Sequence, residues 1–190
     1  MQIDRILYPV SSLGPGERLV IWTIGCSKKC FNCANPELWE NNPDKNINVT
    51  ELVELIRQYI NKNKIDGITI TGGEPLDQIE ELNELLLLIR EIADDILVFT
   101  GYSIEEAIAR IPEHKWEILK NHVSVLIDGP YINKLNDNNH SLLGSTNQNI
   151  IYFDETKKES YSIYIKKGRT VQNVFYNEKI ISVGIHNRDI

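Results

Sequence analysis

The amino-acid sequence predicts an α/β fold built on a parallel β-sheet. Runs of apolar, β-branched residues alternate with stretches of helical periodicity between residues 19 and 127. Several of these runs end in glycine-rich or polar motifs, and all three cysteines follow the first of them. Because the ligands of parallel α/β proteins gather at the carboxyl ends of the strands, these motifs predict one shared site at that edge.

The length and composition predict a single domain. The chain has 190 residues, of which 42% are hydrophobic and 25% charged, as in an ordinary globular protein with a sizeable core. No linker, internal repeat or low-complexity tract divides it. We therefore expect one domain over residues 1–190, with a core of about 14–153 and a β-rich C-terminal extension of about 154–190.

The charge and the N-terminal segment restrict the class of partner. A net charge of −7 argues against a general nucleic-acid binder, which would carry a basic face. No apolar run reaches the length of a membrane span, and the first ten residues lack the apolar region of a signal peptide. We expect a cytoplasmic protein that binds neither nucleic acid nor membrane, and a reducing compartment suits its thiols.

The first third of the chain is expected to supply two strands and a helix. Residues 3–10 alternate loosely and predict an edge strand or one arm of a hairpin. Residues 19–24 form a continuous apolar run, typical of a strand buried on both faces, and Gly25 ends it. Thr50 is the expected N-cap of a helix that runs to Asn61.

The middle of the chain repeats the alternation of strand and helix. Ser103 is expected to cap a helix that Pro112 ends. This order predicts parallel strands joined by right-handed crossovers. The expected strands cover residues 67–71, 96–99 and 123–127, and the expected helices cover residues 79–93, 103–112 and 112–121.

The pattern changes in the last third of the chain. Residues 132–149 are polar, rich in asparagine and without periodicity, so we expect a loop. Three short strands are expected at residues 150–153, 161–165 and 180–185, with a turn at Asn177-Glu178. These strands would extend the sheet or form a small hairpin.

The cysteines point to a metal centre. Cys26, Cys30 and Cys33 are the only cysteines of the chain, and they lie in one short loop. Three thiolates can hold three corners of a cubane 4Fe–4S cluster, which leaves one iron open to a further ligand. Two alternatives remain: a zinc site completed by one of the four histidines, or a disulfide with one cysteine left over.

The motifs resemble those of a known superfamily. The spacing C-x3-C-x2-C is similar to the cluster motif of the radical SAM superfamily, and Gly72-Gly73-Glu74-Pro75 resembles its GGEP motif. Further segments resemble the activating proteins of anaerobic ribonucleoside-triphosphate reductases, a family of glycyl-radical-enzyme activases. The resemblance covers about residues 14–150, and the further segments are residues 18–22, 35–39, 100–102, 128–131 and 144–148.

This resemblance implies a fold and a reaction. The fold would be a partial, open (β/α) barrel of the radical SAM type with a short β-rich C-terminal extension. A three-cysteine 4Fe–4S cluster would bind S-adenosylmethionine and cleave it reductively to methionine and a 5′-deoxyadenosyl radical. The radical would take a hydrogen atom from a glycine of a partner enzyme, expected to be anaerobic ribonucleotide reductase. A flavodoxin- or ferredoxin-type donor would supply the electron.

The resemblance also assigns roles to residues. Cys26, Cys30 and Cys33 would ligate three irons, and no catalytic side chain is expected beyond the cluster and its cofactor. Gly72 and Gly73 would let the backbone approach the methionine moiety, which a side chain would block. The alternative for the Gly-Gly-Glu-Pro motif is a simple strand-to-helix turn.

Four further positions complete the expected cofactor site. Glu74 would accept a hydrogen bond from the ammonium group of the cofactor. Asn32 is placed to meet the adenine through its backbone, and Thr100 and Asp128 are candidates for the ribose or the amino group. Thr100 and Asp128 could instead be helix caps or satisfied polar groups at strand ends.

Two other functions stay open at this point. The first is a radical SAM enzyme that acts on a small molecule or a peptide, as the compact 7-carboxy-7-deazaguanine synthases do. A substrate pocket lined by residues 129–148 would favour it over an open rim. The second is a non-enzymatic iron–sulfur or zinc module, against which the Gly72–Pro75 motif and the series of strand-end motifs count.

Overall fold

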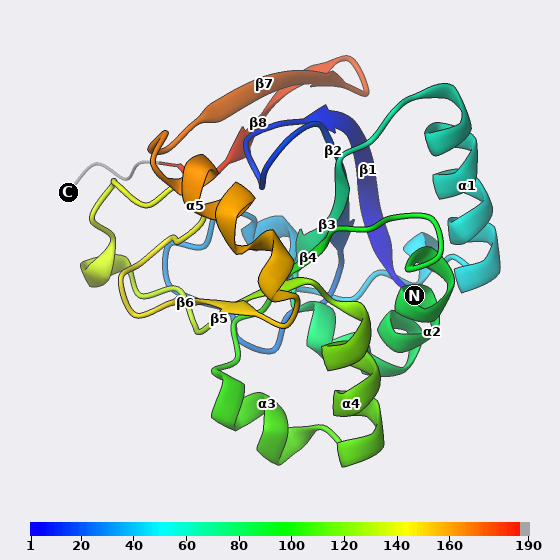
Figure 1. The fold of residues 1–190 in the computed structure, drawn as a ribbon, viewed down its shortest axis with the longest axis horizontal. Helices are drawn as coiled ribbons and strands as arrows, with labels where there is room; N and C mark the ends of the chain where they lie inside the picture. Colours follow the sequence, from blue (N-terminus) through cyan, green and yellow to red (C-terminus); the bar gives the residue numbers. More distant parts are fainter. Residues whose placement is uncertain (187–190) are drawn as a thin grey trace.

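The computed structural model describes residues 1–186 of the chain. Within this range a mixed six-stranded sheet has the order β1-β2-β3-β4-β5-β6, and a separate hairpin pairs β7 with β8. Helices α1 to α4 lie on one side of the sheet in Figure 1, and the hairpin and α5 lie on the other. The strands are β1 (Ile3–Val10), β2 (Arg18–Thr23), β3 (Gly67–Gly72), β4 (Ile96–Phe99), β5 (Val125–Asp128), β6 (Asn149–Tyr152), β7 (Val171–Tyr176) and β8 (Lys179–Gly184).

The helices connect the strands in sequence order. They are α1 (Val49–Lys62), α2 (Ile79–Ile89), α3 (Ile104–Arg110), α4 (Glu113–His122) and α5 (Lys158–Ile165). Short 3-10 turns occur at η1 (Pro36–Leu38), η2 (Pro43–Lys45), η3 (Pro75–Gln78), η4 (Asn133–Leu135) and η5 (Glu155–Lys157).

The predicted parallel core is confirmed. Strands β2, β3, β4 and β5 pair in parallel, so their carboxyl ends meet at one edge of the sheet. The outer strands β1 and β6 pair antiparallel with their neighbours and close the two sides of the parallel core. The α/β class is thereby confirmed, and the motifs after the parallel strands come together as expected.

The two faces of the sheet are covered by different parts of the chain. One face packs on α1, α2 and α4 through a core cluster that includes Leu52, Leu86 and Leu119. The opposite face packs on later segments: Leu97 and Ile127 contact the helix residue Tyr161, while Trp22 belongs to a cluster with the hairpin. The C-terminal extension therefore completes the core of the domain.

The extension differs from its prediction in one element. Residues 161–165 form most of helix α5 instead of the expected strand. Tyr161 and Tyr164, three residues apart, are both buried against the sheet, which only a helical spacing allows. Burial of this aromatic face outweighed the strand propensity of the segment, as tertiary contacts commonly do.

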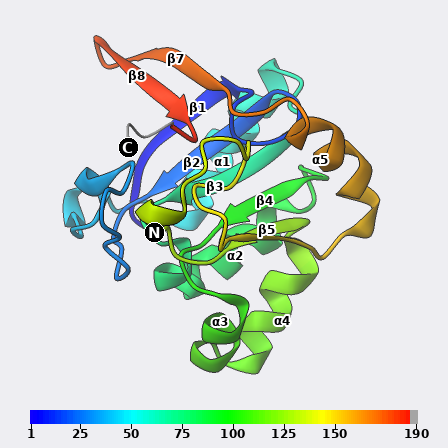
Figure 2. The same cartoon turned by 90° about the vertical axis from the view of Figure 1, so that its left-hand side faces the viewer.

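The hairpin is confirmed in part. Asn177 and Glu178 form the expected turn, with φ angles of 46° and 62°, as two-residue hairpin turns require. The strand predicted at 180–185 is β8, but its partner β7 was not predicted. The hairpin forms a sheet of its own above β1 instead of extending the main sheet (Figure 2).

The helix caps agree with expectation except at α1. That helix begins at Val49, and the side chain of Asn48 accepts the backbone N–H of Thr50, so Asn48 is the N-cap and the prediction of Thr50 was wrong. Ser103 caps α3 in a capping box with Glu106, and α4 begins after Pro112.

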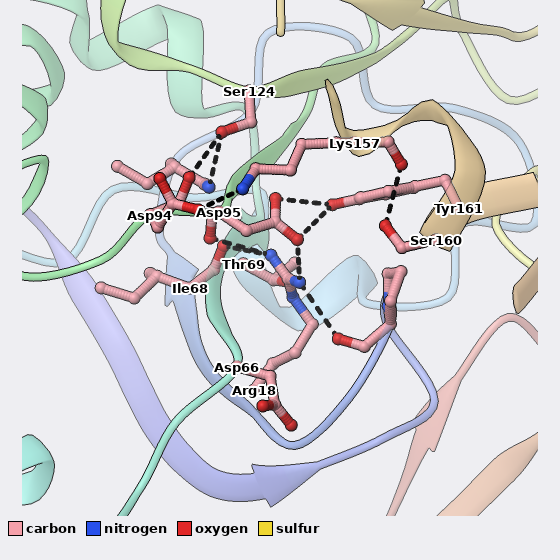
Figure 3. A network of polar contacts seen from close by, with 12 residues as sticks. Arg18, Asp66, Ile68, Thr69, Asp94, Asp95, Ser124, Lys157, Ser160 and Tyr161 are labelled. Carbon is pink, nitrogen blue, oxygen red and sulfur yellow. Dashed lines mark hydrogen bonds and ion pairs between the residues drawn. The ribbon is translucent and has the colours of Figure 1, made fainter. Parts of the chain in front are cut away.

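A buried ion pair ties the extension to the amino ends of the strands (Figure 3). Arg18 has no exposed surface and pairs with Asp95 at 2.7 Å. The hydroxyl of Tyr161 in α5 donates to the same carboxylate at 3.0 Å. The guanidinium also donates to Thr69 Oγ1 and to the carbonyl oxygens of Pro15, Ile68 and Asp95.

Candidate cofactor site

A cavity of about 180 Å³ lies at the carboxyl ends of the parallel strands. Its lining combines the loop after β2, the motif after β3 and the residues that follow β4 and β5. The predicted site residues that line it are Cys26, Cys30, Asn32, Cys33, Gly72, Gly73, Glu74 and Thr100. Asp128 is not part of the lining.

The segment from Gly25 to Cys33, here called the cluster loop, is held at its base. The backbone N–H groups of Gly25 and Cys26 donate to the carbonyl oxygens of Leu38 and Trp39 at 2.8 and 3.0 Å. Farther along, Lys29 and Asn32 adopt positive φ angles of 41° and 56° and reverse the chain twice. These reversals let all three cysteines line the same cavity.

The three free thiols are partly buried, and a metal that binds them would displace their protons. Burial raises the pKa of Cys26 and Cys30 above the ordinary value of a thiol. The sulfur of Cys33 accepts the N–H of Asn35 at 3.4 Å. Metal binding requires thiolates, so it must release protons from this loop.

The described residues offer a cluster site but no single-ion site. Nowhere in residues 1–186 do three His, Cys, Asp or Glu side chains converge on one ion position. A zinc site would need such convergence, whereas a cubane takes each cysteine on a different iron. Three cysteines that line one cavity could supply one ligand to each of three irons of a cubane cluster.

The two glycines at the carboxyl end of β3, Gly72 in the strand and Gly73 after it, are required by the packing of the protein itself. A Cβ on Gly73 would lie 2.2 Å from the carbonyl oxygen of Gly25, and Gly72, at a φ of 111°, faces the backbone of Thr23. The approach to the methionine moiety stays a prediction, and in the structure the two glycines make their close approach to the end of β2 and the cluster loop. The Gly-Gly pair brings the motif after β3 against the first cysteine.

Glu74 is the best-defined polar group of the cavity. Its side chain is 1% exposed, and its oxygens accept from Leu76 N, Thr100 Oγ1 and Gly101 N at 3.0, 2.7 and 2.6 Å. Burial raises its pKa to about 7 in spite of these bonds. A carboxylate has about four acceptor sites, so one remains for a donor in the cavity, such as an ammonium group.

Thr100 and Asp128 differ in their surroundings. The Thr100 hydroxyl lies at the cavity and donates to Glu74, so it orients that carboxylate. Asp128 is 1% exposed and accepts from the N–H of Ile104, which starts α3, and from Asn149 in β6. Asp128 thus has the contacts of a satisfied strand end, and its cofactor role stays a prediction.

Several lining residues were not anticipated from the sequence. The end of β8 and the residues after it, Gly184 to His186, form one wall of the cavity. Arg169 holds this wall to the preceding loop, because its guanidinium donates to the carbonyl oxygens of His186 and Leu143 at 3.0 and 2.9 Å. No local pattern signals this contact, since it joins segments that are far apart in the chain.

Three cysteines in one loop beside a Gly-Gly-Glu-Pro turn, at the carboxyl edge of a parallel sheet, define an iron–sulfur protein of the radical SAM class. Residues 12–151 match the family model of the 4Fe–4S single cluster domain, and the chain belongs to this family.

Two curated relatives support the assignment. Over 136 residues the chain is 35% identical to the anaerobic ribonucleoside-triphosphate reductase-activating protein of Enterobacteria phage T4, covering 69% of this chain and 81% of the phage protein. Over 156 residues it is 31% identical to the pyruvate formate-lyase-activating enzyme of Staphylococcus aureus strain USA300, covering 77% of this chain. The aligned part is 61% of that enzyme, so the chain spans less than two thirds of it.

Both relatives are glycyl-radical activases of the radical SAM superfamily. The chain is accordingly a radical SAM enzyme that takes one 4Fe–4S cluster and S-adenosylmethionine as cofactors. The non-enzymatic module is not supported by these findings. No helix within residues 1–186 has the length and apolar character needed to cross a membrane.

Proposed function

We propose that this enzyme generates a glycyl radical on anaerobic ribonucleotide reductase. The observation that carries the proposal is the shared cavity of the cluster loop and Glu74, together with the match to the phage activating protein over 81% of that protein. The sheet, whose outer strands β1 and β6 are not paired with each other, fits an open, partial barrel. An open barrel leaves a route by which a loop of a partner protein reaches the cluster.

Different residues of the cavity would bind the cluster and the cofactor. Cys26, Cys30 and Cys33 would hold three irons, and Glu74 would accept a hydrogen bond from the ammonium group of the cofactor. The cluster, when bound, supplies the electron that cleaves the sulfonium bond. Asn32 lines the cavity beside Cys33, where its backbone can meet the adenine.

The electron donor and the compartment belong to the same proposal. A flavodoxin- or ferredoxin-type protein would reduce the cluster from the exposed side of the cluster loop, where the side chain of Phe31 is 76% exposed. An exposed, oxygen-sensitive cluster suits the reducing cytoplasm. We place the enzyme there.

The C-terminal extension is the proposed recognition element. The family match ends at residue 151, yet Gly184 to His186 form a wall of the cavity and Arg169 fixes that wall. Residues 154–186 therefore stand where a partner's glycine-containing segment would pass. Choice of the partner would depend on this wall more than on the cysteines.

A small-molecule substrate is the second candidate, and one observation favours it. The loop of residues 129–148 does line the cavity, through Gly129, Tyr131, Asn136, Leu142, Gly144 and Gln148. This is the wall that a compact enzyme acting on a small molecule would need. In the activase, the same loop would cradle the partner's glycine segment.

The test combines the reconstituted enzyme with anaerobic ribonucleotide reductase, S-adenosylmethionine and a strong reductant under anaerobic conditions. We expect a glycyl radical signal in the EPR spectrum and one 5′-deoxyadenosine for each radical. Pyruvate formate-lyase serves as the competing partner, and a reductase with its target glycine changed to alanine is the control. 5′-Deoxyadenosine without a radical on either enzyme would remove the proposed partner and favour the small-molecule candidate.

A pair of variants tests the recognition wall. Arg169→Ala should slow radical formation on the reductase by about tenfold, in the range seen when supporting residues of a metal site are lost, and should slow it more than cofactor cleavage without partner. Lys167→Ala is the matched control, since Lys167 is an exposed basic residue two positions before Arg169. Equal rates for both variants would place recognition elsewhere.

A further inference from the structure

The two halves of the cluster loop differ in how they are held. In the first half, Ser27 and Lys28 contact three other elements of the fold. In the second half, Phe31 is 76% exposed. The position of the first cysteine is therefore constrained through Ser27, whose partners Asp77 and Tyr102 are neither expected metal ligands nor part of the cavity lining.

Asp77, in the turn η3, is the centre of this anchor. Its Oδ2 accepts the backbone N–H of Ser27 at 2.7 Å, directly after the ligand Cys26. Its Oδ1 lies 3.0 Å from the hydroxyl of Ser27 and 2.8 Å from that of Tyr102. Arg110 of α3 adds an ion pair at 3.3 Å. The carboxylate of Asp77 in η3 thus joins the cluster loop to α3 and to the segment between β4 and α3.

Tyr102 is the second member of the anchor. Its ring has the ammonium of Lys28 at 4.5 Å and the guanidinium of Arg110 at 5.0 Å from its centroid, two cation–π contacts on one aromatic ring. Its hydroxyl also lies 2.7 Å from that of Ser27. Burial raises the pKa of Tyr102 to about 12, so the hydroxyl keeps its proton and remains a donor to Asp77.

The same segment holds the cofactor side of the cavity. Thr100 and Gly101 donate to Glu74, and the next residue, Tyr102, contacts Ser27. Three consecutive residues, 100–102, therefore support both Glu74 and the cluster loop. A shift of either side would be transmitted through this short backbone.

We infer that Asp77 and Tyr102 are positioning residues that fix the cluster loop relative to Glu74. By holding the N–H of Ser27, Asp77 would keep Cys26, and with it a bound cluster, in place relative to Glu74. The inference rests on the 4Fe–4S cluster and the cofactor, and it does not depend on which partner receives the radical. Residues outside the ligand set commonly tune a metal site in this way.

The experiment compares Asp77→Ala with a matched control, Glu80→Ala. Glu80 is an acidic residue three positions later whose carboxylate pairs with Lys115, away from the cluster loop. Both proteins would be reconstituted anaerobically and examined for iron content, the cluster's reduction potential, the EPR spectrum with and without S-adenosylmethionine, and cofactor affinity. We expect Asp77→Ala to lower cofactor affinity by about tenfold or more and to alter the cofactor-induced EPR change, with Glu80→Ala like the wild type.

Two milder variants keep the test decisive if Asp77→Ala loses its iron. Asp77→Asn retains an oxygen that can accept the Ser27 N–H and should restore most of the affinity. Tyr102→Phe retains the ring between its two cations and removes the hydroxyl, and should give a smaller shift in potential than Asp77→Ala. A wild-type EPR response and affinity in Asp77→Ala or Tyr102→Phe, or the same loss in Glu80→Ala, would overturn the inference.

Discussion

The two ends of the central sheet carry polar clusters of opposite character. At the amino ends, the Arg18 cluster (Arg18, Thr69, Asp95 and Tyr161) is closed: the guanidinium has no exposed surface and donates to five acceptors within the described chain (Figure 3). At the carboxyl ends, Glu74 borders a cavity and keeps an acceptor site for a ligand. Both clusters are buried, but of the two only the cluster around Glu74 keeps an acceptor site for a ligand.

The comparison shows that polar groups at one end of the sheet stabilise the fold, whereas those at the other end are available to bind a ligand. Arg18 can form five hydrogen bonds as a donor, and the fold supplies acceptors for all of them, so nothing is left to bind a ligand. Ionisation of Glu74 in the folded protein costs free energy, since burial raises its pKa to about 7. Substitutions at the two ends should therefore have opposite signatures.

Cys30→Ala should have the largest effect on chemistry and almost none on the fold. The cluster would be lost and 5′-deoxyadenosine formation abolished, since two cysteines cannot hold the cubane. The free energy of unfolding of the cluster-free chain should change by less than about 1 kcal/mol, because Cys30 lies partly exposed in a loop. Iron analysis, product chromatography and urea unfolding measure the three quantities. Cofactor cleavage at the wild-type rate would contradict the assigned ligand set.

Asp95→Ala should have the opposite signature. It leaves the buried guanidinium of Arg18 without its carboxylate, which costs about 3–5 kcal/mol of unfolding free energy. Urea unfolding measures the loss, and the EPR response to the cofactor should stay intact below the unfolding transition. Asp66→Ala is the control, because Asp66 is exposed and its carboxylate accepts the N–H of Glu17, away from the Arg18 cluster. If the two variants were equally stable, the Arg18 cluster would not be the anchor described here.

The pH dependence of stability should identify Glu74. Its folded pKa of about 7 lies above the ordinary 4.5. Between these values the folded chain keeps a proton that the unfolded chain has released, so stability falls as pH rises from 4.5 to 7. For the cluster-free chain this decline amounts to about 3 kcal/mol. Glu74→Gln should lack this decline, so the difference in unfolding free energy between the two proteins, measured by urea unfolding, should change across this range. Parallel pH curves would show that Glu74 titrates normally.

Tyr161→Phe should have the smallest effect of the series. It deletes one hydroxyl that donates to Asp95 and leaves the ion pair with Arg18 and the packing of the ring in place. The expected loss is about 1 kcal/mol of unfolding free energy. Thermal or urea unfolding measures it, with cluster content as the unchanged control. A loss as large as that of Asp95→Ala would mean that the hydroxyl, and not the ion pair, holds α5 in place.

The parallel core was predictable because its signals are local. The run at residues 19–24 is buried on both faces as β2, and Ser103 caps α3, since periodicity and cap chemistry act over a few neighbouring residues. Residues 161–165 could not be predicted in the same way. Their aromatic and β-branched side chains favour a strand, and only contact with the sheet selects the helix.

The cluster loop and the Gly-Gly-Glu turn could be predicted from the sequence alone. Their position at the same edge of the sheet could be predicted too, because parallel strands bring consecutive carboxyl ends together. Two features are visible only in the tertiary structure: α3 and β6 enclose Asp128, and Gly184 to His186 line one side of the cavity. Those contacts depend on the path of long connections and on hydrogen bonds from Arg169 to carbonyl groups far away in the sequence. Local periodicity cannot predict contacts of this kind.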